Sequence, residues 1–273
     1  MIIDTHSHLN FNAFSDDLDQ VAKRTLAAGM EVINVGTKYE TSKRAVELAQ
    51  QYPQMYAAIG LHPIYAAAEF MKVKTDPDEG EFLIKEQEFD AKKYAELAVM
   101  GKNKVVAIGE IGLDYYYKPK TAAKLVQFKE KQKQVFLQQL DLAKELHLPV
   151  ILHCRVAHDD VIEILKTQPV KGVIHCFTGT LEQAQKYVAM GFYLGINGII
   201  FKFNIDDVIK TIPLDHLVVE TDCPYLTPGP ETGKRNEPLF IKHTIQRIAE
   251  LKGVSFEEVA QQTTQNAKAL FGI

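Results

Sequence analysis

The sequence predicts a closed barrel of eight parallel strands, each followed by a helix or loop, and three observations lead to that prediction. Eight short segments are nearly continuously apolar, as expected of parallel strands covered on their outer face. Helical patterns or loops separate these segments, which is typical of repeated strand–helix units. No Gly-x-Gly-x-x-Gly turn follows the first strand, so the alternative of an open, doubly wound sheet lacks its main support.

Each expected strand is an apolar run that ends at glycine, proline or a polar residue. In chain order the strands are Ile2–Asp4, Glu31–Val35, Tyr56–Ile59, Val105–Ile108, Pro149–His153, Gly172–His175, Phe192–Ile196 and Leu217–Glu220. The expected helices carry apolar residues at helical spacing, and several stop at glycine or before proline. They are Phe14–Ala28, Glu40–Gln51, Ala91–Val99, Thr121–His147, Asp159–Lys166, Leu181–Met190, Ile205–Thr211, Pro238–Leu251 and Ser255–Leu270. In the last of these, Ser255 and Glu258 have the spacing of a capping box.

Length and composition fit one large domain. With 273 residues, of which 46% are hydrophobic, the chain can bury the core of one such barrel, and no repeat or linker divides residues 1–273. One long interruption, about residues 64–101, follows the third strand and includes the acidic, turn-like stretch Thr75–Gly80. A connection of this length in a compact domain is usually either functional or mobile.

Charge and cysteine content narrow the class of protein. A formal net charge of −4 excludes a broadly basic nucleic-acid coat but leaves room for a local cationic pocket. No leader and no membrane-spanning run is recognisable, so we expect a soluble, cytoplasmic protein. Cys154, Cys176 and Cys223 are too few for a disulfide framework. Each follows a candidate ligand, so strand alternation should turn the three toward the outer helices.

The first strand ends in two histidines, His6 and His8, separated by one residue. Side chains at i and i+2 of a strand share a face, so both imidazoles should project from the same strand end. Such a pair forms half of a metal site. An isolated pair of this kind is more often a polar strand end entering a loop, so the site depends on the rest of the chain.

Other strands supply the missing ligands at the same end of the barrel, where active sites of this fold lie. The six candidates, which follow five different strands, are His6, His8, Glu110, His153, His175 and Asp222. Strand parity turns them toward one face, since each shares the face of the strand residue two positions before it. Any one of these histidines alone would be read as a core or loop residue, but their joint placement favours a metal centre.

Four histidines and two carboxylates exceed the needs of one four-coordinate ion, so we expect two divalent ions. Glu110 comes from the strand between the two histidine pairs and is the candidate bridge. One ion would take His6, His8, Glu110 and Asp222, and the other would take Glu110, His153 and His175. Imidazole and carboxylate ligands suit zinc, manganese, iron or nickel, and suit magnesium less well, so the identity of the metal stays open.

Further polar residues are candidates for substrate binding at the rim. Arg155 shares the parity of His153, Lys202 follows the seventh strand, and Arg235 with Asn236 follows the eighth. If these cations converge at the rim of the metal site, they would bind phosphate oxygens, although single surface cations are usually only solvated. His62 after the third strand is either a phosphate or leaving-group contact or packs against its neighbouring proline. Inward-pointing Glu220 needs a partner, and we expect it to hydrogen-bond a ligand histidine.

Seven stretches of the chain resemble the TatD family of metal-dependent DNases. They are Met1–Asn10, Gly109–Tyr116, His153–Arg155, Ile174–Gly179, Glu220–Pro228, Arg235–Pro238 and Thr263–Phe271. The resemblance covers essentially the whole chain and implies a TIM barrel, a divalent-metal centre and hydrolysis of DNA phosphodiester bonds, often as a 3′→5′ exonuclease. The six candidate ligands match the metal positions of the family one by one. The segment at 64–101 departs from the family by its length, which affects how substrate reaches the site.

The resulting hypothesis is phosphodiester hydrolysis assisted by two metals, with Asp222 orienting or deprotonating the attacking water. The expected substrates are DNA strand ends or short oligonucleotides, with no membrane and no obligate protein partner. The main alternative is a deacylase or amidohydrolase acting on an ester or amide such as aminoacyl-tRNA. In the wider amidohydrolase-related superfamily, a carbamylated lysine often bridges the two metals. No lysine ends the fourth strand here, where Glu110 lies, and this favours the nuclease over the deacylase or amidohydrolase. A metal-bound scaffold without turnover is the third alternative.

Overall fold

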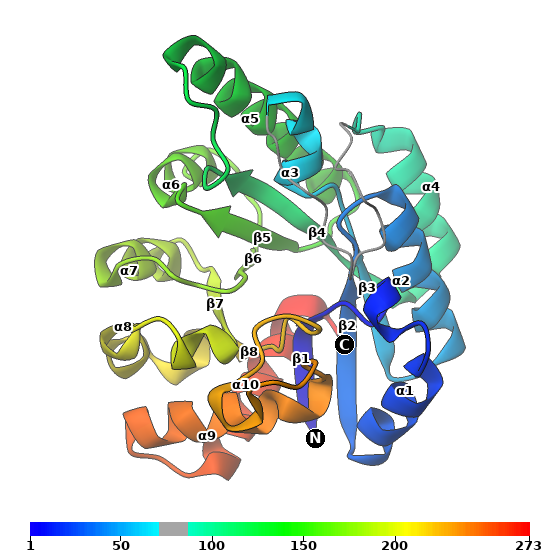
Figure 1. Cartoon of the computed structure of the whole chain (residues 1–273), viewed down its shortest axis with the longest axis vertical. Helices are drawn as coiled ribbons and strands as arrows, with labels where there is room; N and C mark the ends of the chain where they lie inside the picture. Colours follow the sequence, from blue (N-terminus) through cyan, green and yellow to red (C-terminus); the bar gives the residue numbers. More distant parts are fainter. Residues whose placement is uncertain (71–86) are drawn as a thin grey trace.

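The computed structural model describes residues 1–70 and 87–273, and it confirms the predicted (β/α)8 TIM barrel. All eight strands are parallel and form one sheet in the order of the chain (Figure 1). Their bounds are β1 (Ile2–Ser7), β2 (Met30–Val35), β3 (Met55–Ile59), β4 (Val105–Asp114), β5 (Val150–Arg155), β6 (Gly172–Ile174), β7 (Tyr193–Ile196) and β8 (Leu217–Val219). The barrel nearly closes, because Ser7 of β1 bridges Cys223 just after β8.

The helices lie outside the strands and cover the outer face of the barrel (Figure 1). Ten α-helices are described: α1 (Leu18–Ala27), α2 (Tyr39–Gln51), α3 (Pro63–Ala66), α4 (Ala91–Gly101), α5 (Ala122–Glu145), α6 (His158–Leu165), α7 (Leu181–Ala189), α8 (Asp206–Thr211), α9 (Ile241–Lys252) and α10 (Phe256–Phe271). Ser255 caps α10 by accepting a hydrogen bond from the Glu258 amide at 3.0 Å, which is one of the two hydrogen bonds of the predicted capping box. Within the described ranges, no helix combines the length and the apolar character that a membrane crossing needs.

Several element bounds differ from the sequence predictions. Helix α1 begins at Leu18 rather than Phe14, because the preceding residues form the 3-10 turn η1 (Asn12–Phe14). Strand β4 continues to Asp114, because its end pairs with Arg155 of β5. The unexpected short helix α3 begins where the His62 ring accepts a hydrogen bond from the Ile64 amide. The acidic stretch Thr75–Gly80 lies outside the described residues.

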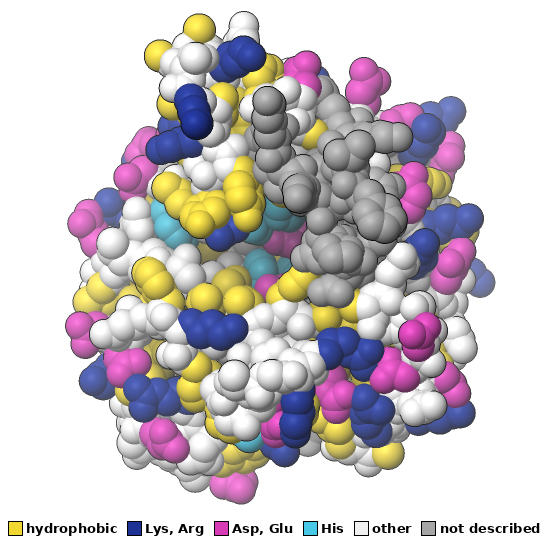
Figure 2. Space-filling view, viewed as in Figure 1, with side chains coloured by type: hydrophobic (Ala, Val, Ile, Leu, Met, Phe, Trp, Pro, Cys, Tyr) yellow, Lys and Arg dark blue, Asp and Glu magenta, His cyan; other side chains and the backbone are white. Residues whose placement is uncertain are grey.

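The core leaves one end of the barrel for a site. Apolar side chains from seven strands, among them Ile3, Ile151 and Val173, fill the interior of the barrel toward the amino ends of the strands. Leu270 and Phe271 of α10 pack against this layer and close the amino end of the barrel. The carboxyl ends of the strands therefore meet at the opposite face. Figure 2 shows a hollow in that face, with histidine and acidic side chains inside it and hydrophobic side chains along part of its rim.

Candidate metal centre

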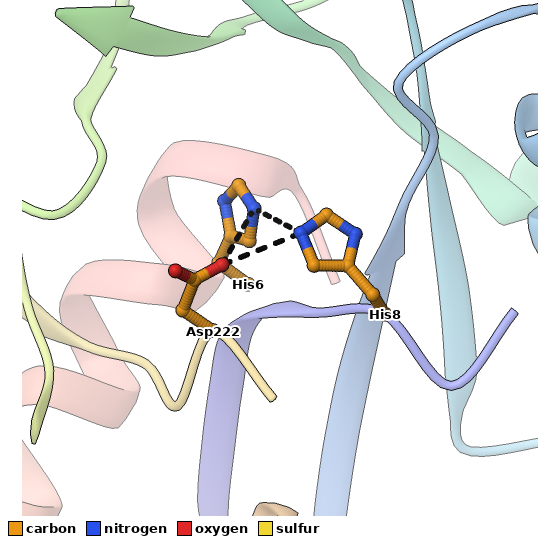
Figure 3. A group of neighbouring side chains, drawn as sticks. All are labelled: His6, His8 and Asp222. Atoms are coloured by element: carbon orange, nitrogen blue, oxygen red, sulfur yellow. Dashed lines mark hydrogen bonds and ion pairs between the residues drawn. The ribbon is translucent and has the colours of Figure 1, made fainter. Parts of the chain in front are cut away.

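The first group of candidate ligands lies at the seam between β1 and β8. Figure 3 shows His6, His8 and Asp222 pointing toward one another. The Nε2 atoms of His6 and His8 are 3.1 Å apart, and Asp222 Oδ1 lies 3.7 Å from His6 Nε2 and 3.3 Å from His8 Nε2. Metal–ligand bonds of about 2.0–2.2 Å at a tetrahedral angle would separate two ligand atoms by roughly 3.3–3.6 Å. These spacings therefore fit one cation held between the three side chains.

Buried polar contacts fix this seam. Asp4 accepts hydrogen bonds from the Thr221 amide at 2.9 Å and the Thr221 hydroxyl at 2.6 Å, which joins the end of β1 to the segment carrying Asp222. Burial raises the pKa of the Asp4 carboxyl to about 7, although those hydrogen bonds oppose the shift. His8 Nδ1 lies 2.8 Å from the Val35 carbonyl oxygen and donates to it, which leaves His8 Nε2 facing the site.

The second group consists of Glu110, His153 and His175, from β4, β5 and the end of β6. Glu110 Oε1 lies 2.6 Å from His153 Nδ1 and 3.8 Å from His175 Nε2. The other oxygen, Glu110 Oε2, lies 3.5 Å from His6 Nε2. The two oxygens of one carboxylate therefore face different groups of imidazoles.

Irregular strand pairing accompanies the inward orientation of two of these ligands, His6 and Glu110. Ile3 packs in the inner layer of the barrel, so strict alternation would point Thr5 inward instead of His6. The pairing of β1 with β2 shifts between Asp4 and Ser7, and this irregularity coincides with His6 turning inward. Likewise Ile108 packs in the outer cluster, and the register of β4 shifts between Ile108 and Ile111, around Glu110. The simple parity expected for Glu110 was therefore wrong, although its side chain reaches the predicted place.

Glu220 lies behind His175, as expected. Its Oε1 is 2.8 Å from His175 Nδ1, and the same oxygen accepts hydrogen bonds from the Cys176 amide and from Asn197 Nδ2. Glu220 is fully buried, so these donors offset the cost of its charge. Its contact with Nδ1 leaves His175 Nε2 for the site. Sequence reasoning missed Asn197, whose only signal was its place directly after an apolar strand.

The electrostatics of the cluster show how strongly it favours positive charge. Burial works against protonation, yet Asp114 and Glu110 raise the pKa of His153 to about 9. Burial also opposes protonation of His175, yet Glu220, Asp222 and Glu110 raise its pKa to about 10. The pKa values of Glu110 and Asp222 fall below their ordinary values, because neighbouring imidazoles outweigh burial. A divalent cation would replace the protons that these imidazoles otherwise hold.

His62 and Asp114 lie beside His153. His62 Nε2 lies 3.7 Å from Glu110 Oε1, and Asp114 Oδ2 lies 3.2 Å from His153 Nε2. Burial and the nearby His153 lower the pKa of His62 to about 3, so His62 is neutral and can donate or accept a hydrogen bond. Sequence reasoning gave Asp114 no role. Its position at the end of the strand that carries Glu110 was the available signal.

A small pocket of about 250 Å³ opens above the ligands and is lined by His153, His175 and Asp222, together with Arg155 and Cys176. Cys176 therefore reaches the pocket wall, because its positive φ of 46° turns it out of the strand direction, contrary to the expectation for all three cysteines. Cys223 is buried in an outer cluster as expected, and Cys154 packs in the outer cluster but also borders the pocket.

The predicted rim cations have different surroundings. Arg155 is exposed and lines the pocket, and its Cζ lies 3.7 Å from the ring centroid of Tyr116. Lys202 directly follows the 3-10 turn η4 (Gly198–Phe201), is exposed and makes no ion pair within the described parts of the chain. Both cations are thus available to an incoming anion.

Arg235 and Asn236 have structural partners instead. Arg235 Nη1 and Nη2 donate to the two carboxylate oxygens of Asp17 at 2.9 and 2.7 Å, and the guanidinium lies over the Phe14 ring. In the structure its guanidinium is therefore engaged in a bidentate ion pair, and its predicted phosphate contact stays a prediction. Asn236 is buried and donates to the Thr221 carbonyl, so it braces the segment around Asp222 rather than reaching the pocket.

Comparisons with known proteins agree over the full length. The family model described as TatD related DNase matches residues 3–272. The chain is 42% identical to the uncharacterized metal-dependent hydrolase YabD of Bacillus subtilis, over 100% of both proteins. It is 34% identical to the 3′-5′ ssDNA/RNA exonuclease TatD of Escherichia fergusonii, over 100% of this chain and 99% of that protein. The crystal structure of YjjV, a TatD homologue from Escherichia coli K12, matches with a TM-score of 0.82 and 33% identity, covering 100% of this chain and 98% of that one.

Proposed function

This chain belongs to the TatD-related DNase family, and from that membership and its site we propose that it is a divalent-metal-dependent hydrolase of phosphodiester bonds in nucleic acid. The proposed substrate is the end of a single DNA strand or a short oligonucleotide, shortened from its 3′ end. Two relatives support the reaction by their names, one a metal-dependent hydrolase and one a 3′-5′ ssDNA/RNA exonuclease.

The position of Glu110 is the observation that carries the proposal. Its Oε2 faces His6, and its Oε1 faces His153 and His175. A carboxylate between two sets of imidazoles is the arrangement of a site for two ions, and paired ions are characteristic of phosphodiester hydrolysis. We therefore assign His6, His8, Glu110 and Asp222 to one ion, and Glu110, His153 and His175 to the other.

When bound, two such ions would supply Lewis acidity toward the phosphate and a water of lowered pKa. The donor set of imidazoles and carboxylates fits Mn²⁺, Zn²⁺ or similar ions better than Mg²⁺. Asp222 lines the pocket, and its pKa is held below the ordinary value despite burial. It is therefore ionised at neutral pH, and we assign it to orient the attacking water and accept its proton.

Other residues would position the phosphate and the ligands. Arg155 is exposed and lines the pocket, and Lys202 is exposed three residues after Ile199 of the pocket wall; we assign both to phosphate oxygens as negative charge builds up. Neutral His62 would donate to a phosphate or leaving-group oxygen beside Glu110. Glu220 would hold the His175 ring through Nδ1, and Asn236 would brace the segment carrying Asp222.

The charge of the molecule supports a short contact with nucleic acid. The net charge of −4 disfavours a long track along duplex DNA, and the pocket of about 250 Å³ is small. A strand end can place its last phosphodiester beside Asp222 with few phosphate contacts. We therefore expect salt to weaken binding less than it does for a protein with a broad basic surface.

The test is hydrolysis of single-stranded oligonucleotides labelled at the 3′ or the 5′ end, in EDTA and then with Mg²⁺, Mn²⁺ or Zn²⁺ restored. We expect no cleavage in EDTA and, with metal, a ladder that shortens the strand from its 3′ end. Glu182→Gln serves as a control for the preparation of variant protein. It makes the same change of Glu to Gln as a substitution of Glu110 would, but at a far more exposed side chain.

Two outcomes would contradict the proposal. Cleavage that persists in EDTA, from protein shown to be free of metal, would remove the metal-dependent mechanism. No cleavage with any of the three ions, from protein shown to hold two ions, would remove nucleic acid as substrate and direct attention to esters and amides.

A further inference from the structure

A groove leads outward from the small pocket beside Asp222. We call it the aromatic groove; it encloses about 770 Å³, and its walls include Tyr116, Arg155, Val156, Thr178, Ile199 and Phe203. This volume lies within the range of about 300–1,000 Å³ that is common for sites of small organic ligands. Arg155, Thr178 and Ile199 also line the small pocket, so the two spaces share a wall and are adjacent.

Exposed apolar side chains concentrate in this groove. Within the described residues nine large hydrophobic side chains are exposed, and three of them, Tyr116, Val156 and Phe203, line it. Their relative exposures are 54%, 63% and 50%. Scattered single apolar residues are ordinary on a protein surface, but a group beside an active site indicates a binding surface. The hydrophobic rim of the hollow is visible in Figure 2.

The backbone at Val156 supports the same conclusion. Its φ is +58°, a left-handed conformation that is rare for a β-branched residue. The side chain gains no burial from this conformation, since it stands exposed on the groove wall. Backbone conformations of this kind concentrate at sites of function, where the surrounding structure holds them in place.

Among the described charged residues of the groove, Asp160 has cation partners, whereas Asp159 and Arg155 have no ion pair, and Arg155 stands at the inner end that the small pocket shares. Asp160 is paired with Lys133 at 3.2 Å, and Asp159 accepts a hydrogen bond from Gln183 at 3.0 Å. Arg155 has no carboxylate partner within the described residues and instead lies over the Tyr116 ring. The inner end can therefore take an anion, while the outer walls offer aromatic and aliphatic surface.

A nucleotide has that combination of charge and flat apolar surface. We infer that the aromatic groove is a base-stacking subsite, in which Tyr116 and Phe203 contact the base of a nucleotide next to the scissile phosphate and Arg155 contacts its phosphate. This inference rests on the proposed function and narrows its substrate to strands with an unpaired base at that position. Because every base has a π-face, stacking of this kind accepts all four bases.

The groove is tied to the ligand cluster through Asp114. Its Oδ2 lies 3.2 Å from His153 Nε2, and its Oδ1 accepts a hydrogen bond from the Tyr116 amide at 2.8 Å. The same carboxylate thus contacts a candidate ligand and the backbone of the residue that carries the stacking ring. A base held on Tyr116 would therefore lie beside the strand end that carries Glu110 and Asp114.

The test measures binding of two single strands by fluorescence anisotropy to the Mn²⁺-loaded protein. Both strands carry phosphorothioate linkages that resist cleavage, and one has abasic nucleotides at its 3′ end. The wild type should bind the base-bearing strand roughly tenfold more tightly, since stacking on an aromatic side chain is worth about 1–3 kcal/mol per base. Tyr116→Ala should reduce this preference to near one, and Phe203→Ala should reduce it in part. Tyr116→Phe, which retains the ring, should keep it.

The control variant Val126→Ala removes an exposed apolar side chain that does not line the groove and should leave the preference unchanged. The inference is overturned if the wild type binds both strands equally, or if Tyr116→Ala weakens both strands by the same factor, which would mean that the ring only orders Arg155. A preference that depends on Tyr116 in a protein that cleaves no oligonucleotide would contradict the proposed function alone.

Discussion

The floor and the rim of the site are built in different ways. On the floor, His6, Glu110 and His175 are buried, and each contacts a partner from the end of another strand. On the rim, Arg155 at the end of β5 and Lys202 after η4 are exposed, and no carboxylate within the described residues pairs with either one. The floor is preorganised for a cation before any ligand arrives, whereas the rim cations can follow the substrate. Metal binding and substrate binding should therefore respond to separate sets of substitutions.

The largest effect should come from Glu110→Gln. Its two oxygens face different imidazole groups, so the substitution removes the negative charge from both proposed metal positions at once. We expect a loss of kcat of at least about 1,000-fold and a lower content of both ions, because a bridging carboxylate contributes to each. Activity assays combined with metal analysis of the purified variant check this. Wild-type activity, or loss of only one ion, would contradict the bridging assignment.

Acidification should weaken metal binding next most strongly. His153 and His175 have pKa values of about 9 and about 10 without metal, so both hold protons at pH 7 that must leave when an ion binds. The sign follows directly, since a lower pH strengthens the competing protons. At pH 7 we expect release of about two protons per protein, and at least about 100-fold weaker binding at pH 6 than at pH 8. Titration calorimetry in buffers of different ionisation enthalpy measures the protons, and no release would contradict the charge state derived for these rings.

Glu220→Gln should affect one ion more than the other. The carboxylate contacts Nδ1 of His175 and no other candidate ligand histidine at ion-pair distance within the described residues. Loss of a charged partner behind a ligand histidine typically costs 10- to 100-fold in metal affinity. We therefore expect biphasic metal titration, with the weaker phase shifted by about that factor. An equal shift of both phases would show that Glu220 stabilises the barrel as a whole instead of orienting one ring.

The gathering of the six candidate ligands could be predicted because strand order and strand ends are local properties of the sequence. The means by which His6 and Glu110 face inward could not, because each depends on a register shift against a neighbouring strand. Arg235 shows the same limit on the rim. Its place on the loop after the eighth strand favoured a phosphate contact, but its ion-pair partner Asp17 lies 218 positions away in the chain. Partners brought together by the fold decide whether a charge is free, and sequence neighbours do not reveal them.

The smallest effects should separate Arg235 from Lys202. Arg235 is paired with Asp17, so Arg235→Gln should lower the free energy of unfolding by about 0.5–1 kcal/mol, as for a partly exposed ion pair, and change kcat/KM less than about threefold. Lys202 has no ion-pair partner among the described residues. Lys202→Gln should leave stability unchanged but raise KM for an oligonucleotide a fewfold, and the salt dependence of binding should lose about one phosphate contact.

Thermal unfolding and steady-state kinetics at two salt concentrations distinguish the two variants. If Arg235→Gln raised KM more than Lys202→Gln did, the ion pair with Asp17 would have to open during substrate binding, and Arg235 would return to the substrate site as the sequence first indicated. If neither substitution changed the salt dependence, the rim would contribute no charge to binding beyond Arg155. The adaptable part of the site would then consist of one cation, Arg155, which lies over the Tyr116 ring.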